Sequence, residues 1–215
     1  MTSIIDKTCE FVENKLGGDG SGHDWWHIFR VWTTAKKMAK EEKAHMETVE
    51  LGALLHDIAD WKFHGGDDSI GPAVAEEFLN KNDADPKLTQ SVIEIISTIS
   101  YKGAGVATPM KTLEGKIVQD ADRLDAIGAI GIARTFAYGG YKNRLIYHPG
   151  EKPVLHQNYS DYKNNEGHTI NHFYEKLLLL KDRMNTEAGK RIAKSRHLFM
   201  EKYLEQFYKE WDGIA

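Results

Sequence analysis

The chain has 215 residues, a formal net charge of −4 and a single cysteine, Cys9. Its length suffices for one large domain, or two small ones, with a proper hydrophobic core. The negative charge argues against a dedicated nucleic-acid-binding protein, which usually carries a basic face. One cysteine excludes an intramolecular disulfide and a zinc site built from several thiolates.

No apolar run approaches the roughly 20 residues that a membrane-spanning helix needs. The N-terminal segment alternates charged and apolar residues and lacks the apolar core of a signal peptide. We therefore expect a soluble, cytoplasmic protein with neither a membrane nor a nucleic acid as a stable partner.

Apolar residues recur at helical spacing along almost the whole chain, and no segment shows the alternation of a strand. Asp85-Pro86 is typical of a helix start, with an N-cap followed by proline in the first turn. The expected helices cover residues 2–16, 23–43, 46–60, 69–80, 86–100, 112–136 with a break near Gly128 or Gly131, 167–183 and 186–210. The prediction is an all-α fold in one domain over residues 1–215.

Two segments differ from the amphipathic helices in the rest of the chain. Residues 46–60 are apolar over so much of the helix circumference that we place this helix in the centre of the bundle. Residues 139–165 are polar, aromatic and interrupted by glycine and proline. A loop of that length in a compact domain is usually a functional lid or a disordered excursion, so we predict a long loop or lid near 139–165.

Two histidines and two aspartates lie inside predicted helices and can face inward. His27 precedes the apolar Val31 by one turn, and His56 and Asp57 are neighbours that can both reach one point near the surface of the third helix. Asp122 lies in the helix expected from residue 112. Acids on inward faces are costly unless a cation compensates them. Imidazoles with carboxylates suit one divalent ion that keeps positions open for water or phosphate.

Each signal alone has an ordinary structural explanation. An inward histidine is usually a core residue, and a His-Asp dipeptide is common by chance. The joint occurrence of these histidines and aspartates, in this order and with these neighbouring residues, favours a metal site.

The order His27, His56-Asp57 and Asp122 resembles the HD superfamily of metal-dependent phosphohydrolases. The flanking sequences HxxRV from His27, LLHDI around His56 and DADRLD around Asp122 sharpen the match. The C-terminal segment from GHTINHFYEKLLLL onward is similar to a bacterial subgroup of small HD hydrolases that act on nucleoside and deoxynucleoside triphosphates. The resemblance covers about residues 2–211 and implies an HD-type helical bundle in which these four residues are the metal ligands.

By the same resemblance, Asp60 takes the place of a glutamate that orients or activates water in related (p)ppGpp hydrolases. Lys62 follows Asp60 closely, and Lys62 or Arg30 would stabilise the charge that develops on the leaving phosphate. Trp61 stands where those hydrolases carry a second acid, which weakens a claim of (p)ppGpp hydrolysis. Between Asp57 and Asp122 the chain offers only His64 as a further histidine, so we expect one metal ion.

That ion is a divalent cation, with Mn²⁺ as the first expectation. Fe²⁺, Zn²⁺, Ni²⁺, Co²⁺ and Mg²⁺ stay open, because histidine and carboxylate ligands suit several metals.

A triphosphate substrate needs further cations around it. The candidate substrate contacts are Arg30, Lys102, Arg123, His172 and Lys176. The alternative for each is a solvated helix-surface charge, and Arg30 could instead pair with Asp24 or Asp125.

We therefore expect a nucleotide phosphohydrolase that cleaves between the α and β phosphates, giving monophosphate and pyrophosphate. Release of the terminal phosphate, nucleotidase action on a monophosphate, and a catalytically silent nucleotide-binding regulatory module are the alternatives. A homodimer is left open.

Overall fold

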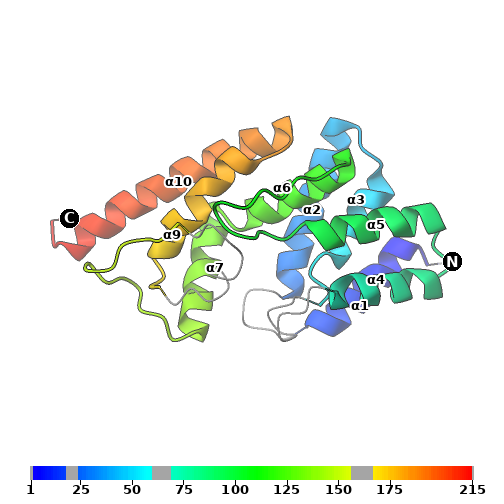
Figure 1. Cartoon of the computed structure of the whole chain (residues 1–215), viewed down its shortest axis with the longest axis horizontal. Helices are drawn as coiled ribbons and strands as arrows, with labels where there is room; N and C mark the ends of the chain where they lie inside the picture. Colours follow the sequence, from blue (N-terminus) through cyan, green and yellow to red (C-terminus); the bar gives the residue numbers. More distant parts are fainter. Residues whose placement is uncertain (1, 18–23, 60–68, 156–166, 215) are drawn as a thin grey trace. The chain divides into compact units, whose positions relative to one another are not determined.

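A computed structural model describes residues 2–17, 24–59, 69–155 and 167–214. Within these ranges the chain forms helices and no β-strand, which confirms the all-α prediction (Figure 1). The elements are α1 (Ile4–Leu16), α2 (Trp25–Glu42), α3 (Met46–Leu55), α4 (Ile70–Lys81), α5 (Pro86–Thr98), α6 (Leu113–Asp125), α7 (Gly128–Tyr141), α9 (Asn171–Glu175), the 3-10 helix η2 (Leu177–Arg183) and α10 (Glu187–Trp211). None of these helices is both long and apolar enough to cross a lipid bilayer.

The chain groups into two compact units. The first comprises residues up to 101 together with 107–122, and the second comprises 102–106 together with the residues from 123 onward. The single domain expected over residues 1–215 stays a prediction.

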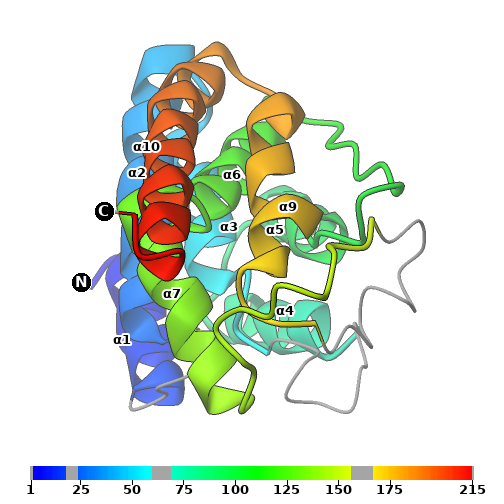
Figure 2. The same ribbon diagram turned by 90° about the vertical axis from the view of Figure 1, so that its left-hand side faces the viewer.

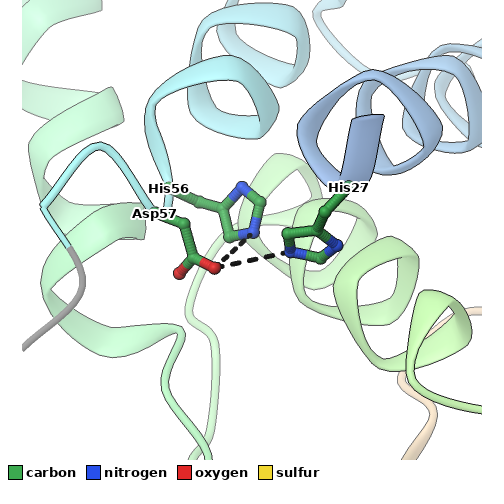
Figure 3. A group of neighbouring side chains, drawn as sticks. All are labelled: His27, His56 and Asp57. Atoms are coloured by element: carbon green, nitrogen blue, oxygen red, sulfur yellow. Dashed lines mark ion pairs between the residues drawn. The ribbon is translucent and has the colours of Figure 1, made fainter. Parts of the chain in front are cut away.

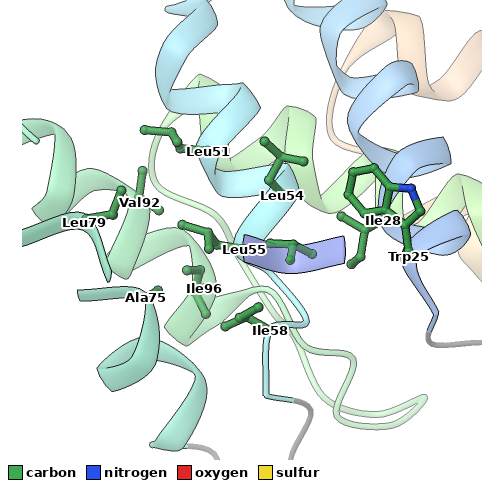
Figure 4. Packing of buried hydrophobic residues seen from close by; sticks show 11 residues of the cluster. Trp25, Ile28, Leu51, Leu54, Leu55, Ile58, Ala75, Leu79, Val92 and Ile96 are labelled. Carbon is green, nitrogen blue, oxygen red and sulfur yellow. The ribbon is translucent and has the colours of Figure 1, made fainter. Parts of the chain in front are cut away.

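Helix α3 is the centre of the first unit, as its sequence predicts. It packs against α1, α2 and α5, and seven of its ten residues are buried. Gly52 permits this close packing, because a Cβ there would lie 3.3 Å from the Val118 side chain and 3.4 Å from that of Ile95. The core around α3 consists of apolar side chains from five helices and the turn after α3 (Figure 4): Val12, Trp25, Ile28, Leu51, Leu54, Leu55, Ile58, Ala75, Leu79, Val92 and Ile96.

The helix expected over residues 46–60 is too long by several residues. Helix α3 ends at Leu55, and residues 56–59 form turns. The amide N–H of Ile58 donates to the carbonyl of Leu55 at 3.2 Å, a tighter pattern than an α-helix makes. The α-helix therefore stops just before the His-Asp pair.

The second unit contains α7, α9, η2 and α10, with α10 packed against α7 and η2 (Figure 2). The predicted break in the helix over residues 112–136 is confirmed, because α6 ends at Asp125 and α7 begins at Gly128 with a φ of +76°. A left-handed backbone conformation of this kind favours glycine.

Two boundaries in this unit differ from the predictions. The single helix expected over residues 167–183 is wrong: α9 and η2 are separated at Lys176, whose φ of −141° and ψ of −59° interrupt the helix. The loop expected from residue 139 begins later, because α7 continues to Tyr141. Carbonyls of Leu145 and Ile146 accept hydrogen bonds from the backbone at residues 169 and 170, which ties the start of the loop to the segment before α9. Residues 156–165 of the predicted lid lie outside the described residues.

Candidate metal centre

Helix α2 presents His27 in its first turn. Asp24 is the N-cap residue, and its Oδ1 accepts the backbone N–H of His27 at 2.9 Å. The cap satisfies one of the amide groups that a helix start leaves unpaired. His27 is 1% exposed, so the inward orientation predicted from the sequence is confirmed.

His56 and Asp57 come from the turn that follows α3. The His56 ring is 5.3 Å from the ring of His27 between centroids, and the two rings are inclined at 69°. The ligand atoms of His27, His56 and Asp57 all lie within 4.8 Å of one another (Figure 3). Three potential ligands from two elements thus converge on one point.

Asp122 of α6 lies beside the same two imidazoles. Its Oδ1 is 3.6 Å from Nε2 of His27 and 3.7 Å from Nε2 of His56. Oδ2 of Asp57 is 3.4 and 3.7 Å from the same two nitrogens. Two ligands that share one ion at about 2.1 Å are separated by about 3.0–3.4 Å. The spacing of 3.4 Å lies within this range and the other three exceed it by 0.2–0.3 Å, so a small inward shift of the side chains would suit a single bound cation.

The His56 side chain is oriented for metal binding. Its Nδ1 lies 2.8 Å from the carbonyl oxygen of Ala53, which can accept a hydrogen bond only if Nδ1 carries the proton. This tautomer leaves the lone pair of Nε2 available to a metal. Nε2 is buried and makes no hydrogen bond in the part of the chain that the structure describes. A buried acceptor of this kind fits a metal ligand.

The electrostatics of the cluster favour a positive charge. Burial opposes protonation of His56, but the carboxylates of Asp57 and Asp122 outweigh it and raise the pKa of the imidazole to about 9. Burial likewise opposes ionisation of Asp122, yet the neighbouring His56 and His27 hold its pKa well below the usual range. The Asp57 and Asp122 side chains are 21% and 34% exposed, so the cluster is open to water on the carboxylate side.

The Asp24 cap leads to a testable prediction. Replacing Asp24 by alanine removes the side-chain acceptor of the His27 N–H and leaves only the backbone carbonyl of residue 24, which lies at 3.0 Å. We expect the free energy of unfolding to fall by about 1 kcal/mol. Replacing it by asparagine retains a side-chain oxygen and should cost much less. Urea denaturation of both variants measures the difference, and equal losses would contradict the capping role.

The two residues predicted to be catalytic, Asp60 and Lys62, lie outside the described residues, as do Trp61 and His64. Their roles stay predictions. Arg30 is half-buried in α2. Of its two alternative carboxylate partners, Asp24 caps α2 and Asp125 forms an ion pair with Arg134 at 3.0 Å.

The other predicted substrate contacts all belong to the second unit. Lys102 begins a short glycine-containing loop, His172 lies in α9, and Lys176 follows that helix. Arg123 is buried, and its Nη1 donates to the carbonyl of Arg183. Its side chain therefore has a structural partner that its position in the sequence does not reveal. Contact of any of these residues with substrate stays a prediction.

Comparison with known proteins gives a consistent family match. The family model "HD domain" matches residues 25–127, a range that includes all four candidate ligands. YpgQ of Bacillus subtilis, a curated protein described as uncharacterized, is 37% identical over 212 residues, which cover 95% of this chain and 92% of YpgQ.

Several solved structures are similar to this chain over nearly its whole length. A protein of Lactobacillus plantarum has 34% identity and a TM-score of 0.87, with 99% of this chain and 100% of that one covered. An HD-superfamily hydrolase of Bacillus thuringiensis has 44% identity and a TM-score of 0.74 over 97% and 96% of the two chains. YpgQ in complex with ADP has 34% identity and a TM-score of 0.76 over 98% and 100%.

Proposed function

Because the chain belongs to the HD superfamily of metal-dependent hydrolases, we propose that it hydrolyses nucleoside or deoxynucleoside triphosphates. The bond cleaved is the anhydride between the α and β phosphates, and the products are a monophosphate and pyrophosphate. The observation that carries the proposal is the convergence of His27, His56 and Asp57 on one point, with Asp122 beside the same two imidazoles. The proposal that the substrate is a nucleotide is supported by the ADP complex of YpgQ.

Four side chains would hold one divalent ion: His27, His56, Asp57 and Asp122. When bound, such an ion acts as a Lewis acid toward phosphate oxygen and lowers the pKa of a coordinated water. Mn²⁺ is the first candidate, because two imidazoles with two carboxylates are less natural ligands for Mg²⁺. HD domains that need two ions use further histidines, and between Asp57 and Asp122 this chain has one, His64.

The remaining roles fall to residues beside the cluster. Ala53 fixes the His56 tautomer through its carbonyl, which keeps Nε2 directed toward Asp57 and Asp122. Asp60 would position the attacking water or accept its proton. Lys62 and Arg30 would stabilise the negative charge that develops on the phosphate.

A product assay tests the proposal. The purified protein, first treated with a chelator and then supplied with Mn²⁺, is incubated with dATP, and pyrophosphate and orthophosphate are measured separately. We expect pyrophosphate and dAMP in equal amounts, and no product without added metal.

Each alternative gives a different result in the same assay. Orthophosphate with dADP would indicate release of the terminal phosphate, and hydrolysis of dAMP alone would indicate a nucleotidase. Binding of dATP without any product would indicate a regulatory module. Any of these three outcomes contradicts α–β cleavage.

A further inference from the structure

Helix α3 carries a buried glycine, Gly52, one turn before His56. Glycine inside a helix is less favourable than alanine, because it loses more backbone freedom on folding. The spacing of four residues places Gly52 and His56 on the same face of the chain, since the backbone of His56 is still helical. The reason for a glycine at this position must therefore lie in what packs against that face.

Side chains from two other helices of the first unit pack against Gly52. A Cβ at position 52 would lie 3.3 Å from Cγ2 of Val118 in α6 and 3.4 Å from Cδ1 of Ile95 in α5. Carbon atoms in favourable contact are about 3.5–4.0 Å apart. Both neighbours are buried, and β-branched side chains in helices are restricted at χ1. An added methyl group would therefore move the helices apart by a few tenths of an ångström, because neither side chain can rotate out of its way.

The contact between Gly52 and Val118 lies beside a pair of candidate metal ligands. Gly52 precedes His56 by four residues. Val118 precedes Asp122 by four residues as well. Because residues four apart share one helix face, each partner of this contact is followed, one turn later, by a ligand. The distance between α3 and α6 at Gly52 thus affects the distance between the two ligands.

This ligand pair tolerates little further separation. Nε2 of His56 is 3.7 Å from Oδ1 of Asp122, whereas two ligands of one ion are about 3.0–3.4 Å apart. The two atoms must therefore approach each other by about 0.3 Å to share an ion. A methyl group at position 52 requires a displacement of similar size in the opposite direction.

We propose that Gly52 is a positioning residue, whose missing side chain lets α6 bring Asp122 close enough to His56 for both to bind one metal ion. The inference rests on the metal centre of the proposed function. It adds to that centre a residue that supplies no ligand atom.

Replacing Gly52 by alanine tests the inference. The protein is treated with a chelator and titrated calorimetrically with Mn²⁺, and we expect the Kd for Mn²⁺ to rise about tenfold. Because alanine favours a helix and so offsets part of the crowding, the melting temperature of the metal-free protein should change by less than about 4 °C. The matched control is Gly140→Ala in α7, where a Cβ meets nothing within 4 Å, and its Kd should equal that of the wild type.

Removing the obstacle on α6 should reverse the effect. Val118→Ala deletes the atom that crowds position 52, so the double variant Gly52→Ala/Val118→Ala should bind Mn²⁺ within about twofold of Val118→Ala alone. Val118→Ala by itself leaves a cavity and lowers stability. General destabilisation would therefore make the double variant bind Mn²⁺ more weakly, whereas the positioning role predicts recovery.

A second substitution makes the test independent of the folding of Gly52→Ala. Val118→Ile enlarges the same contact from the side of α6 and leaves Gly52 in place, so it should also raise the Kd for Mn²⁺. A wild-type Kd in both Gly52→Ala and Val118→Ile would overturn the positioning role. A raised Kd in Gly52→Ala that the double variant does not restore would overturn it as well.

The inference can fail separately from the proposed function. A wild-type protein that binds Mn²⁺ but does not hydrolyse dATP would refute the proposed function, and the comparison of Kd values among the variants would still decide the role of Gly52. A wild-type protein that binds no Mn²⁺ would overturn the inference itself.

Discussion

Replacing His56 by alanine is expected to abolish metal binding and turnover together. His56 is 6% exposed and its Nε2 lies 3.7 Å from both Asp57 and Asp122, so no other side chain can take its place without rearrangement. Without the ligand, Asp57 and Asp122 also lose the imidazole that stabilises their negative charges. Loss of the metal removes several kcal/mol of transition-state stabilisation, on the order of a 10³-fold fall in rate or more.

Elemental analysis, calorimetric titration with Mn²⁺ and the pyrophosphate assay measure these effects. The matched control is His148→Ala, because the His148 side chain is 51% exposed and belongs to the loop after α7. It should retain the metal and the activity of the wild type. A His56→Ala protein that keeps one equivalent of metal and full activity would show that the site lies elsewhere.

Replacing Gly131 by alanine is expected to destabilise the fold more than any other exchange of glycine for alanine in α7. A Cβ at Gly131 would lie 2.2 Å from the carbonyl oxygen of Ala126 and 2.4 Å from its carbonyl carbon. The obstacle is backbone at the junction of α6 and α7, which cannot rotate away as a side chain can. We expect the free energy of unfolding to fall by at least about 2 kcal/mol, as for an overpacked core.

Gly140 provides the control within the same helix. A Cβ there meets nothing within 4 Å, so Gly140→Ala adds no clash. Alanine restricts the unfolded chain and favours a helix, and the free energy of unfolding should rise by about 0.5–1 kcal/mol. Urea denaturation followed by far-UV circular dichroism compares the two variants. A Gly131→Ala protein as stable as Gly140→Ala would mean that the junction adjusts without cost.

The two predictions address different parts of the chain. The His56→Ala substitution alters the metal centre in the first unit, so it should reduce activity while the protein stays folded. The Gly131→Ala substitution alters the helix junction in the second unit, so its main effect should be a lower free energy of unfolding. Because the expected readouts differ, failure of one leaves the other intact.

Several features followed from the sequence alone. Helical periodicity predicted the elements of the described chain to within a few residues, except near residues 56–60, 139–141 and 167–183. Asp85 with Pro86 marked a helix start, and Gly128 marked the break between α6 and α7. These signals are local, because caps, proline and apolar spacing act within one or two turns. The grouping of His27, His56, Asp57 and Asp122 was predictable for another reason, since their order and flanking residues carry the family resemblance.

Other features were decided only by tertiary structure. Arg123 lies 60 positions from its acceptor at Arg183, and Arg183 lies 80 positions from Gly103. No periodicity or cap links residues so far apart, because their hydrogen bonds form only when packing brings them together. The end of α3 at Leu55 and the division between α9 and η2 likewise depend on where the chain must turn in the fold. The sequence by itself thus determined an all-α chain and its candidate metal ligands. Tertiary structure decided how the ligands converge and which carbonyls Arg183 binds in residues 103–106, because long-range contacts override local preference.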